Sequence, residues 1–174
     1  MPSKEILREF AKLAVEIGVN IQKGQPLNVN APVEAYEFIK EVVKVAYEAG
    51  ASKVNVEWSN DDISRMHYEY CDTDVLKEVP NWALDKTQYF IDQHVANLHI
   101  MSDDPDLLDG IDPNKIKEVM MSRMKATSKF RYYSMNNVGQ WSIIAYPNLK
   151  WAKKVFPDLD DDKAMDALWD AILK

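Results

Sequence analysis

Acidic side chains cluster at two places where the sequence predicts that a strand has just ended. Asp61 and Asp62 follow the predicted strand 53–58, and Asp103 and Asp104 follow the predicted strand 95–101. In a parallel sheet, both loops lie at the carboxyl ends of the strands, where ligands usually bind. Four carboxylates there can hold a hard cation or attract the amine of a substrate. Because aspartate is also a common helix N-cap and turn residue, we prefer the capping interpretation.

The histidines and the cysteine offer weaker candidates for chemistry. His99 lies two residues after Asn97, on the same side of a predicted strand, and is a candidate cleft residue. The preferred interpretation is that it is an ordinary histidine of the core or of a sheet edge. His67 and Cys71 would share one face of a helix, but zinc would need two further ligands. Nothing in the sequence supplies a base that would activate Cys71. We therefore assign no catalytic residue and no metal ligand to this chain.

Common catalytic and nucleotide-binding motifs are missing from the sequence. It contains no H-E-x-x-H, no G-x-S-x-G, no Walker A loop and no G-x-G-x-x-G. The five glycines are spread along the chain and form no phosphate-binding cluster. This argues against the commonest nucleotide-binding α/β domains. An independent enzyme built on His67 or His99 would lack a complete set of partners.

The hydrophobic pattern predicts alternating strands and helices. A strand–helix–strand unit covers about 25–58, and further strands are expected at 95–101 and 140–146. Helices are expected at about 3–17, 33–49, 61–78 (in one piece or two), 80–91, 113–130, 148–156 and 160–174, with a short helical piece after Pro105. Residues 1–174 thus read as a single three-layer α/β domain, in which helices pack on a small, largely parallel sheet.

The predicted strands are unusual because they alternate. Central parallel strands usually read as continuous apolar runs. Here polar residues occupy one side of each strand: Asn28, Asn30, Asn55, Glu57, Asn97 and His99. Either that side of the sheet meets something polar, or the strands are partly solvated edge strands. We prefer the second interpretation.

Charge and composition limit the partners. The formal net charge is −7, and no basic stripe with interleaved aromatic residues appears. Binding to nucleic acid or to an anionic membrane is therefore not expected, since both require a cationic surface. The single cysteine and the absence of an apolar leader favour a cytoplasmic location.

The last predicted helix has an apolar stripe of Ala164, Leu168 and Ile172, with Trp169 beside it, and lacks a glycine cap at its end. This pattern suggests a surface that a longer chain would cover. The alternative is that the helix docks on its own domain.

Five segments of the sequence resemble one known family. They are G-V-N-I-Q-K-G-Q-P-L-N-V-N-A-P-V-E at 18–34, A-Y-E-A-G-A-S-K-V at 46–54, W-S-N-D-D-I-S-R at 58–65, Y-P-N-L-K-W-A-K-K-V-F-P at 146–157 and A-M-D-A-L-W-D-A-I at 164–172. In this order and spacing they are similar to the N-terminal region of the aminopeptidase T / aminopeptidase S family. The resemblance extends over nearly the whole chain.

The resemblance implies a metal-dependent aminopeptidase of about twice this length, cytoplasmic and homodimeric. Such enzymes release N-terminal residues from peptides with two divalent metal ions, zinc or cobalt, held by the C-terminal half. This chain would then be the non-catalytic N-terminal domain, which would shape the substrate cleft, assist assembly and have the C-terminal catalytic domain as its partner. Asp61, Asp62, Asp103, Asp104 and His99 are the substrate-cleft candidates. The alternative is a free-standing α/β binding module for a small polar ligand, in which Leu168, Trp169 and Ile172 would be buried within the domain.

Overall fold

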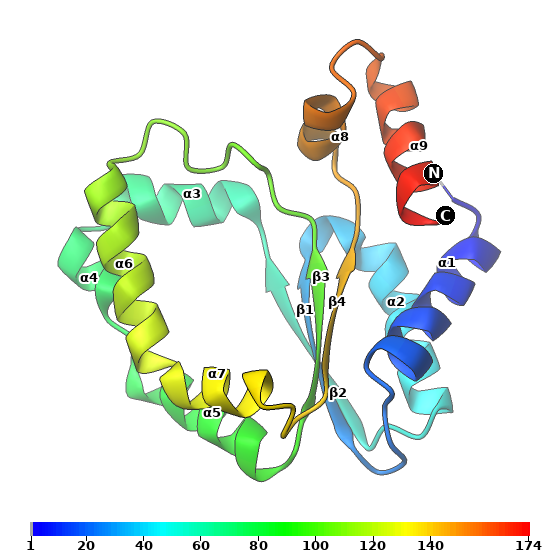
Figure 1. The fold of residues 1–174 in the computed structure, drawn as a ribbon, viewed down its shortest axis with the longest axis horizontal. Coiled ribbons are helices and arrows are strands. Elements are labelled where there is room, and N and C mark those ends of the chain that lie inside the picture. Colours follow the sequence, from blue (N-terminus) through cyan, green and yellow to red (C-terminus); the bar gives the residue numbers. More distant parts are fainter. Residues whose placement is uncertain (1) are drawn as a thin grey trace.

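The computed structural model describes residues 2–174, and within them the chain forms a parallel sheet of four strands (Figure 1). The strand order is β2-β1-β3-β4, and every neighbouring pair is parallel. The strands are β1 (Pro26–Pro32), β2 (Lys53–Ser59), β3 (Ala96–Met101) and β4 (Trp141–Ala145). The prediction of a three-layer α/β fold with a largely parallel sheet is confirmed.

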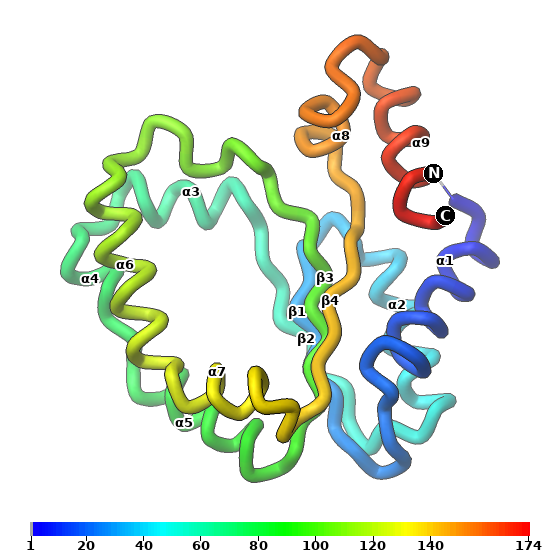
Figure 2. Tube along the Cα trace, in the orientation of Figure 1, coloured from blue at the N-terminus to red at the C-terminus, as the bar shows by residue number. Residues whose placement is uncertain are grey.

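Helices cover both faces of the sheet (Figures 1 and 2). One layer contains α1 (Lys4–Lys12), which continues as a π-helical turn (Leu13–Gly18), and α2 (Tyr36–Glu48), which follows a 3₁₀ turn (Val33–Ala35). The chain then forms an arc over the opposite face with α3 (Asp61–Tyr70), α4 (Thr73–Lys77), α5 (Asn81–Asp92), α6 (Pro113–Ala126) and α7 (Ser128–Met135). The chain ends with α8 (Leu149–Val155) and α9 (Asp161–Ile172), and the last of these returns to the N-terminal helix.

The main hydrophobic core lies between the sheet and the layer of α1 and α2. Leu27, Val29 and Leu98 point into it from the two central strands and are buried. Phe38 of α2 lies at its centre, with ring centroids 5.3 Å from Phe10 and 5.8 Å from Tyr146. Burying so much aromatic and aliphatic surface on one side makes this half of the molecule its stable scaffold.

Helix α9 packs on this core. Leu168 and Trp169 are 4% and 3% exposed, and the Trp169 ring meets Tyr146 edge to face at 5.1 Å. Ile172 is partly buried in the same cluster. The domain itself therefore buries Leu168 and Trp169, as the docking alternative predicts, whereas Ile172 at the end of the helix is only partly covered.

The outer side of α1 carries apolar residues that the domain leaves uncovered. Ile6, Leu13 and Ile17 are spaced at helical intervals from Phe10 and Ala14, but they are 45%, 54% and 70% exposed. The buried positions lie around the helix from them, at Phe10, Ala11, Ala14 and Val15. Helix α1 thus has a wider apolar face than this domain fills.

Two expected helices differ from the structure. The predicted helix 113–130 breaks at Thr127, where the backbone leaves helical geometry (φ −94°, ψ 13°) and the Thr127 hydroxyl donates to the Arg123 carbonyl at 2.8 Å. The hydroxyl is a second donor to a carbonyl that already accepts from the Thr127 amide (2.9 Å), and such back-bonding by Ser and Thr often bends helices. The segment after Pro105 forms successive turns instead of the expected short helix.

The face of the sheet opposite the core is polar, and its residues lie in rows across the strands. One row is Asn55, Asn28 and Asn97, and the next is Glu57, Asn30 and His99. Four of these residues belong to the central strands β1 and β3, so the preferred interpretation, solvated edge strands, is wrong for them. The polar side of these strands instead faces the arc of helices α5 and α7.

Candidate functional site

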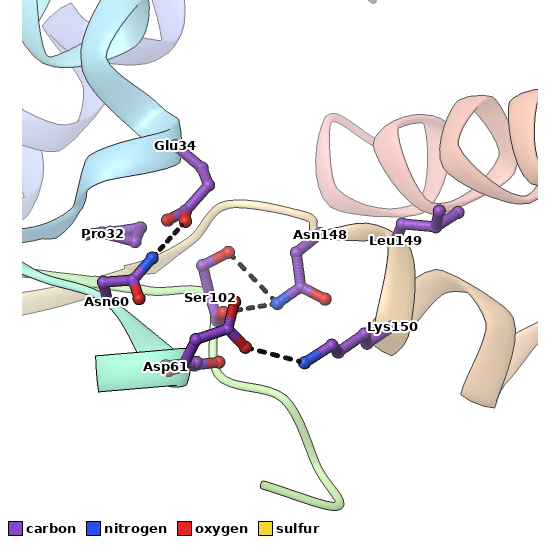
Figure 3. A pocket seen from close by; sticks show the side chains of 9 residues that line it. Pro32, Glu34, Asn60, Asp61, Ser102, Asn148, Leu149 and Lys150 are labelled. Atoms are coloured by element: carbon purple, nitrogen blue, oxygen red, sulfur yellow. Dashed lines mark hydrogen bonds and ion pairs between the residues drawn. The ribbon is translucent and has the colours of Figure 1, made fainter. Parts of the chain in front are cut away.

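The carboxyl ends of the strands surround a small cavity. In the order β2-β1-β3-β4, the connection after β1 leads to β2 at one edge of the sheet, and the connection after β3 leads to β4 at the other edge. The two connections therefore diverge at the carboxyl ends of β1 and β3, where α/β sheets commonly bind ligands. A cavity of about 160 Å³ lies at this end (Figure 3). It is lined by Pro32, Glu34, Asn60, Asp61, Asp62, Ser102, Asn148, Leu149 and Lys150.

Two asparagines hold the rim of this cavity because each one caps a helix. Asn60 Oδ1 accepts from the Ile63 amide (3.1 Å) at the start of α3, while Asn60 Nδ2 donates to Glu34 Oε1 (2.8 Å). Asn148 Oδ1 accepts from the Trp151 amide (2.8 Å) at the start of α8. The Asn148 Nδ2 group donates to the Ser102 carbonyl, which ties α8 to the loop after β3 (Figure 3).

The acidic loops are joined by a second set of contacts. Asp61 Oδ2 accepts from the backbone amide of Asp104 (2.8 Å), which links the start of α3 to the loop after β3. Lys150 Nζ lies 3.1 Å from Asp104 Oδ2 and 3.5 Å from Asp62 Oδ1. Lys150 therefore pairs with one aspartate of each acidic loop, Asp62 and Asp104, and the two loops form one connected cluster.

The two central carboxylates have opposite pKa shifts. Burial raises the pKa of Asp61, assisted by the charges of Asp103 and Asp104 and opposed by the hydrogen bond from the Asp104 amide. Burial also acts to raise the pKa of Asp104, but the Asp106 amide and the Lys150 ammonium lower it below its ordinary value. The same contact raises the pKa of Lys150. The cluster thus keeps Asp104 ionised and makes Asp61 the carboxylate that protonates more readily.

The structure brings together most, but not all, of the predicted site residues. Asp62 and Asp104 both lie beside Lys150, and Asp61 joins them through its hydrogen bond with the Asp104 amide. Asp103 is exposed in the same loop as Asp104. The preferred capping or turn interpretation fits Asp104, which accepts from the Asp106 amide in a turn (2.9 Å). It does not fit Asp61 and Asp62, because Asn60 is the residue that caps α3. His99 lies apart from the cavity lining, exposed on the polar face of β3 in register with Asn30 and Ile143.

The described side chains do not fit a metal centre. Among residues 2–174, no three His, Cys, Asp or Glu side chains gather closely enough to hold an ion. His67, for example, is exposed on α3, and Cys71 is partly buried just beyond the end of that helix, where the backbone is extended. A cavity with paired charges and capped helix ends suits the binding of a small polar group.

Sequence reasoning missed several residues of the cavity. Asn60, Asn148 and Lys150 also follow strand ends, so the rule that selected the aspartates would have found them if it had been applied to every polar residue after a strand. Ser102 comes directly after β3 and is buried. Among the residues that follow strands, only the aspartates were selected, and this is why their pairing with Lys150 was not predicted.

A family model described as "Thermophilic metalloprotease (M29)" matches residues 3–174. The chain belongs to this M29 family. Its curated relatives include "Aminopeptidase AmpS" of Bacillus subtilis (35% identical over 168 residues) and "Aminopeptidase 2" of Geobacillus stearothermophilus (37% over 168 residues). In each case the match covers 97% of this chain and 41% of the relative.

A solved structure agrees with this assignment. "Wild-type AmpT from Thermus thermophilus" superposes with a TM-score of 0.89 at 28% sequence identity, covering 98% of this chain and 43% of that one. This chain therefore corresponds to an N-terminal part of M29 aminopeptidases and spans about two fifths of their length. The buried stripe of α9 taken alone would have favoured the alternative of an independent binding module. The comparisons establish the family instead.

No helix within residues 2–174 is long and apolar enough to cross a membrane.

Proposed function

We propose that this M29 chain is the non-catalytic N-terminal part of a metallo-aminopeptidase that releases N-terminal residues from peptides, and that it shapes the substrate cleft. The observation that carries the proposal is the match over 97% of this chain but only 41% of the relatives. The acidic loops support it, because Asp61 accepts a hydrogen bond from the Asp104 amide and Asp104 forms an ion pair with Lys150, which suits a rigid wall.

The family description implies a metal, and the remaining part of the enzyme would have to supply its ligands. We propose two divalent ions, zinc or cobalt, bound outside residues 2–174, because no suitable group of ligands lies within them. This chain's own contribution would be binding and positioning of the peptide. Its active form would be cytoplasmic and homodimeric.

The wall that meets substrate would be the carboxyl end of the sheet. Asp62 and Asp103 are exposed there and carry charges opposite to the ammonium group of a peptide N-terminus. Asp61 and Asp104 would hold these two loops in place, and His99 would extend the wall along the polar face of β3. This domain would thus attract the peptide's amine, while the peptide bond would be cleaved in the remaining part of the enzyme.

A second surface suits the C-terminal catalytic domain of the same protein. Ile6, Leu13 and Ile172 border a groove of about 460 Å³ between α1 and the end of α9. Ile17 continues this exposed apolar side along the same helix. Exposed apolar surface of this kind commonly marks a contact between domains. In the full-length enzyme we expect the metal-binding half to cover it.

The test is a chimera in which this chain replaces the matching part of aminopeptidase T from Thermus thermophilus. The double variant Asp62→Ala/Asp103→Ala removes two exposed charges from the proposed wall. We expect KM for a dipeptide to rise by about two- to fivefold with kcat unchanged, since exposed charges contribute only a fraction of a kcal/mol each.

The matched control is Asp158→Ala/Asp170→Ala, which removes two exposed charges near α9 and changes the net charge equally. Its KM should stay at the unmodified value. An unmoved KM in the first variant, or an equal rise in the control, would contradict the proposed role of these loops.

A further inference from the structure

Three asparagines form a row across the polar face of the sheet. Asn55 of β2, Asn28 of β1 and Asn97 of β3 are paired in register on adjacent parallel strands. Asn30 lies two residues beyond Asn28, on the same side of β1. We call these four residues the amide face. Neighbouring strands are about 4.8 Å apart, so the carboxamides repeat at that spacing.

The amide face has hydrogen-bonding groups that the protein does not use. Asn28 is 1% exposed, and its Oδ1 accepts from Asn55 Nδ2 (2.6 Å), while its own Nδ2 has no partner among residues 2–174. Asn97 Nδ2 donates to the Val95 carbonyl (2.9 Å), which leaves Asn97 Oδ1 free within the same described residues. The half-buried carboxamide of Asn30 has no bond to any of them. These donors and acceptors are therefore available to a ligand.

These unused groups line a cavity of about 330 Å³ between the sheet and α5. Asn28, Asn30 and Asn97 form its floor, and Phe90 and Phe130 contribute to its walls. The charges at its edge are already paired, because Lys86 forms an ion pair with Glu57 and lies 5.6 Å from the centre of the Phe90 ring. A charged ligand would have to break this pair, so the cavity favours a neutral polar one.

We propose that the amide face binds the main chain of a short peptide segment in extended form. A carboxamide offers one acceptor and two donors, which match the N–H and C=O of a peptide group. The aromatic walls would take an apolar side chain of the peptide, and the cavity lies at the small end of the range for ligand sites. The choice of a peptide over another neutral polar ligand rests on the proposed function.

The test uses the 174-residue chain labelled with ¹⁵N, because side-chain amides give their own NMR signals. The probe is N-acetyl-trialanine amide, which has peptide groups but no charged ends. We expect saturable shifts of the carboxamide signals of Asn28, Asn30 and Asn97. The Asn30→Ala variant, which loses no protein hydrogen bond, should weaken binding about three- to tenfold.

Asn97→Ala is a second variant with the same expected direction, and the spectrum of each variant shows directly whether it is folded. The matched control is Asn114→Ala, an exposed asparagine in the first turn of α6, which should bind as the unmodified chain does. Three results would overturn the inference: no saturable shift, shifts confined to Asn60 and Asn148 at the other cavity, or equal weakening in the control.

Maltotriose serves as the competing neutral ligand. If it shifts the amide-face signals and the peptide does not, the site binds a saccharide and the inference is wrong. Failure here is distinct from failure of the proposed function. The chimera can still hydrolyse peptides with the expected KM response at Asp62 and Asp103, and in that case only the amide-face site is rejected.

Discussion

The two faces of the sheet differ in how they are covered. On one face, Leu27, Val29 and Leu98 pack against α1, α2 and α9, and α2 alone buries six residues. On the other, Asn28, Asn30 and Asn97 face a cavity, and the arc from α3 to α7 consists mainly of exposed and half-buried residues. The same strands thus carry a stable core on one side and a polar, accessible surface on the other. Folding stability and ligand contact are separated across one sheet.

The largest expected effect is the loss of an aromatic ring from the core face. Phe38 is fully buried, so Phe38→Ala should lower the free energy of unfolding by about 3–5 kcal/mol. Phe130 of α7 is half-buried in the arc, and Phe130→Ala should lower the free energy of unfolding by only about 1–2 kcal/mol. Urea unfolding of the two variants measures the difference. Equal losses would contradict the division into scaffold and arc.

Hydrogen exchange should show the same division without mutation. The amides of β1 and β3 lie in the core and should exchange at rates close to those of global unfolding. The amides of α5 and α6 should exchange about 100-fold faster or more, because few of their residues are buried. Mass spectrometry of peptic fragments resolves these segments. Equal protection of the arc and the core strands would show that the arc unfolds only with the core.

The smallest effects come from the acidic cluster, where two variants should respond to pH in opposite ways. The folded pKa of Asp104 is lowered, so its stabilising contribution is present above the ordinary pKa of about 4 and is lost as pH falls through the lowered value. The folded pKa of Asp61 is raised, so its contribution is present below that ordinary value and is lost as pH rises through the raised one.

Relative to the unmodified chain, Asp104→Asn should therefore become more destabilising as pH rises from about 3 to about 6, and Asp61→Asn should become less so. Chemical unfolding at several pH values measures both slopes. Asparagine keeps an oxygen that can accept the Asp104 amide, which makes Asp61→Asn a suitable comparison. Slopes of the same sign would show that the cluster has been assigned incorrectly.

The sequence was a good guide to the elements and a poorer guide to how they pack. Alternating strands and helices predicted the parallel α/β sheet, and the polar residues of the strands were recognised as unusual. Strand order was not readable from the pattern, so Asn28 and Asn97 were assigned to edge strands although β1 and β3 are central. The apolar stripe of α9 was visible, but whether it packs on α8 and the core depends on tertiary contacts.

The candidate site was predicted only in part for the same reason. Strand ends located the loops of Asp61 and Asp104, since parallel strands bring these loops to one edge. The opposing lysine, Lys150, comes from the first turn of α8, far along the chain, and its contact with both acidic loops requires the fold. His99 was a cleft candidate beside Asn97 on the polar side of its strand, but β3 places it on the sheet face and away from the cavity at the strand ends.

The most direct test of the account is peptide hydrolysis by two proteins with added zinc or cobalt. One is the 174-residue chain alone, and the other is the chimera that joins it to the remaining part of aminopeptidase T. The account predicts no release of amino acids by the chain alone, and release by the chimera that a chelator abolishes. Release by the chain alone, lost on chelation and restored by metal, would contradict the claim that its chemistry resides elsewhere in the enzyme.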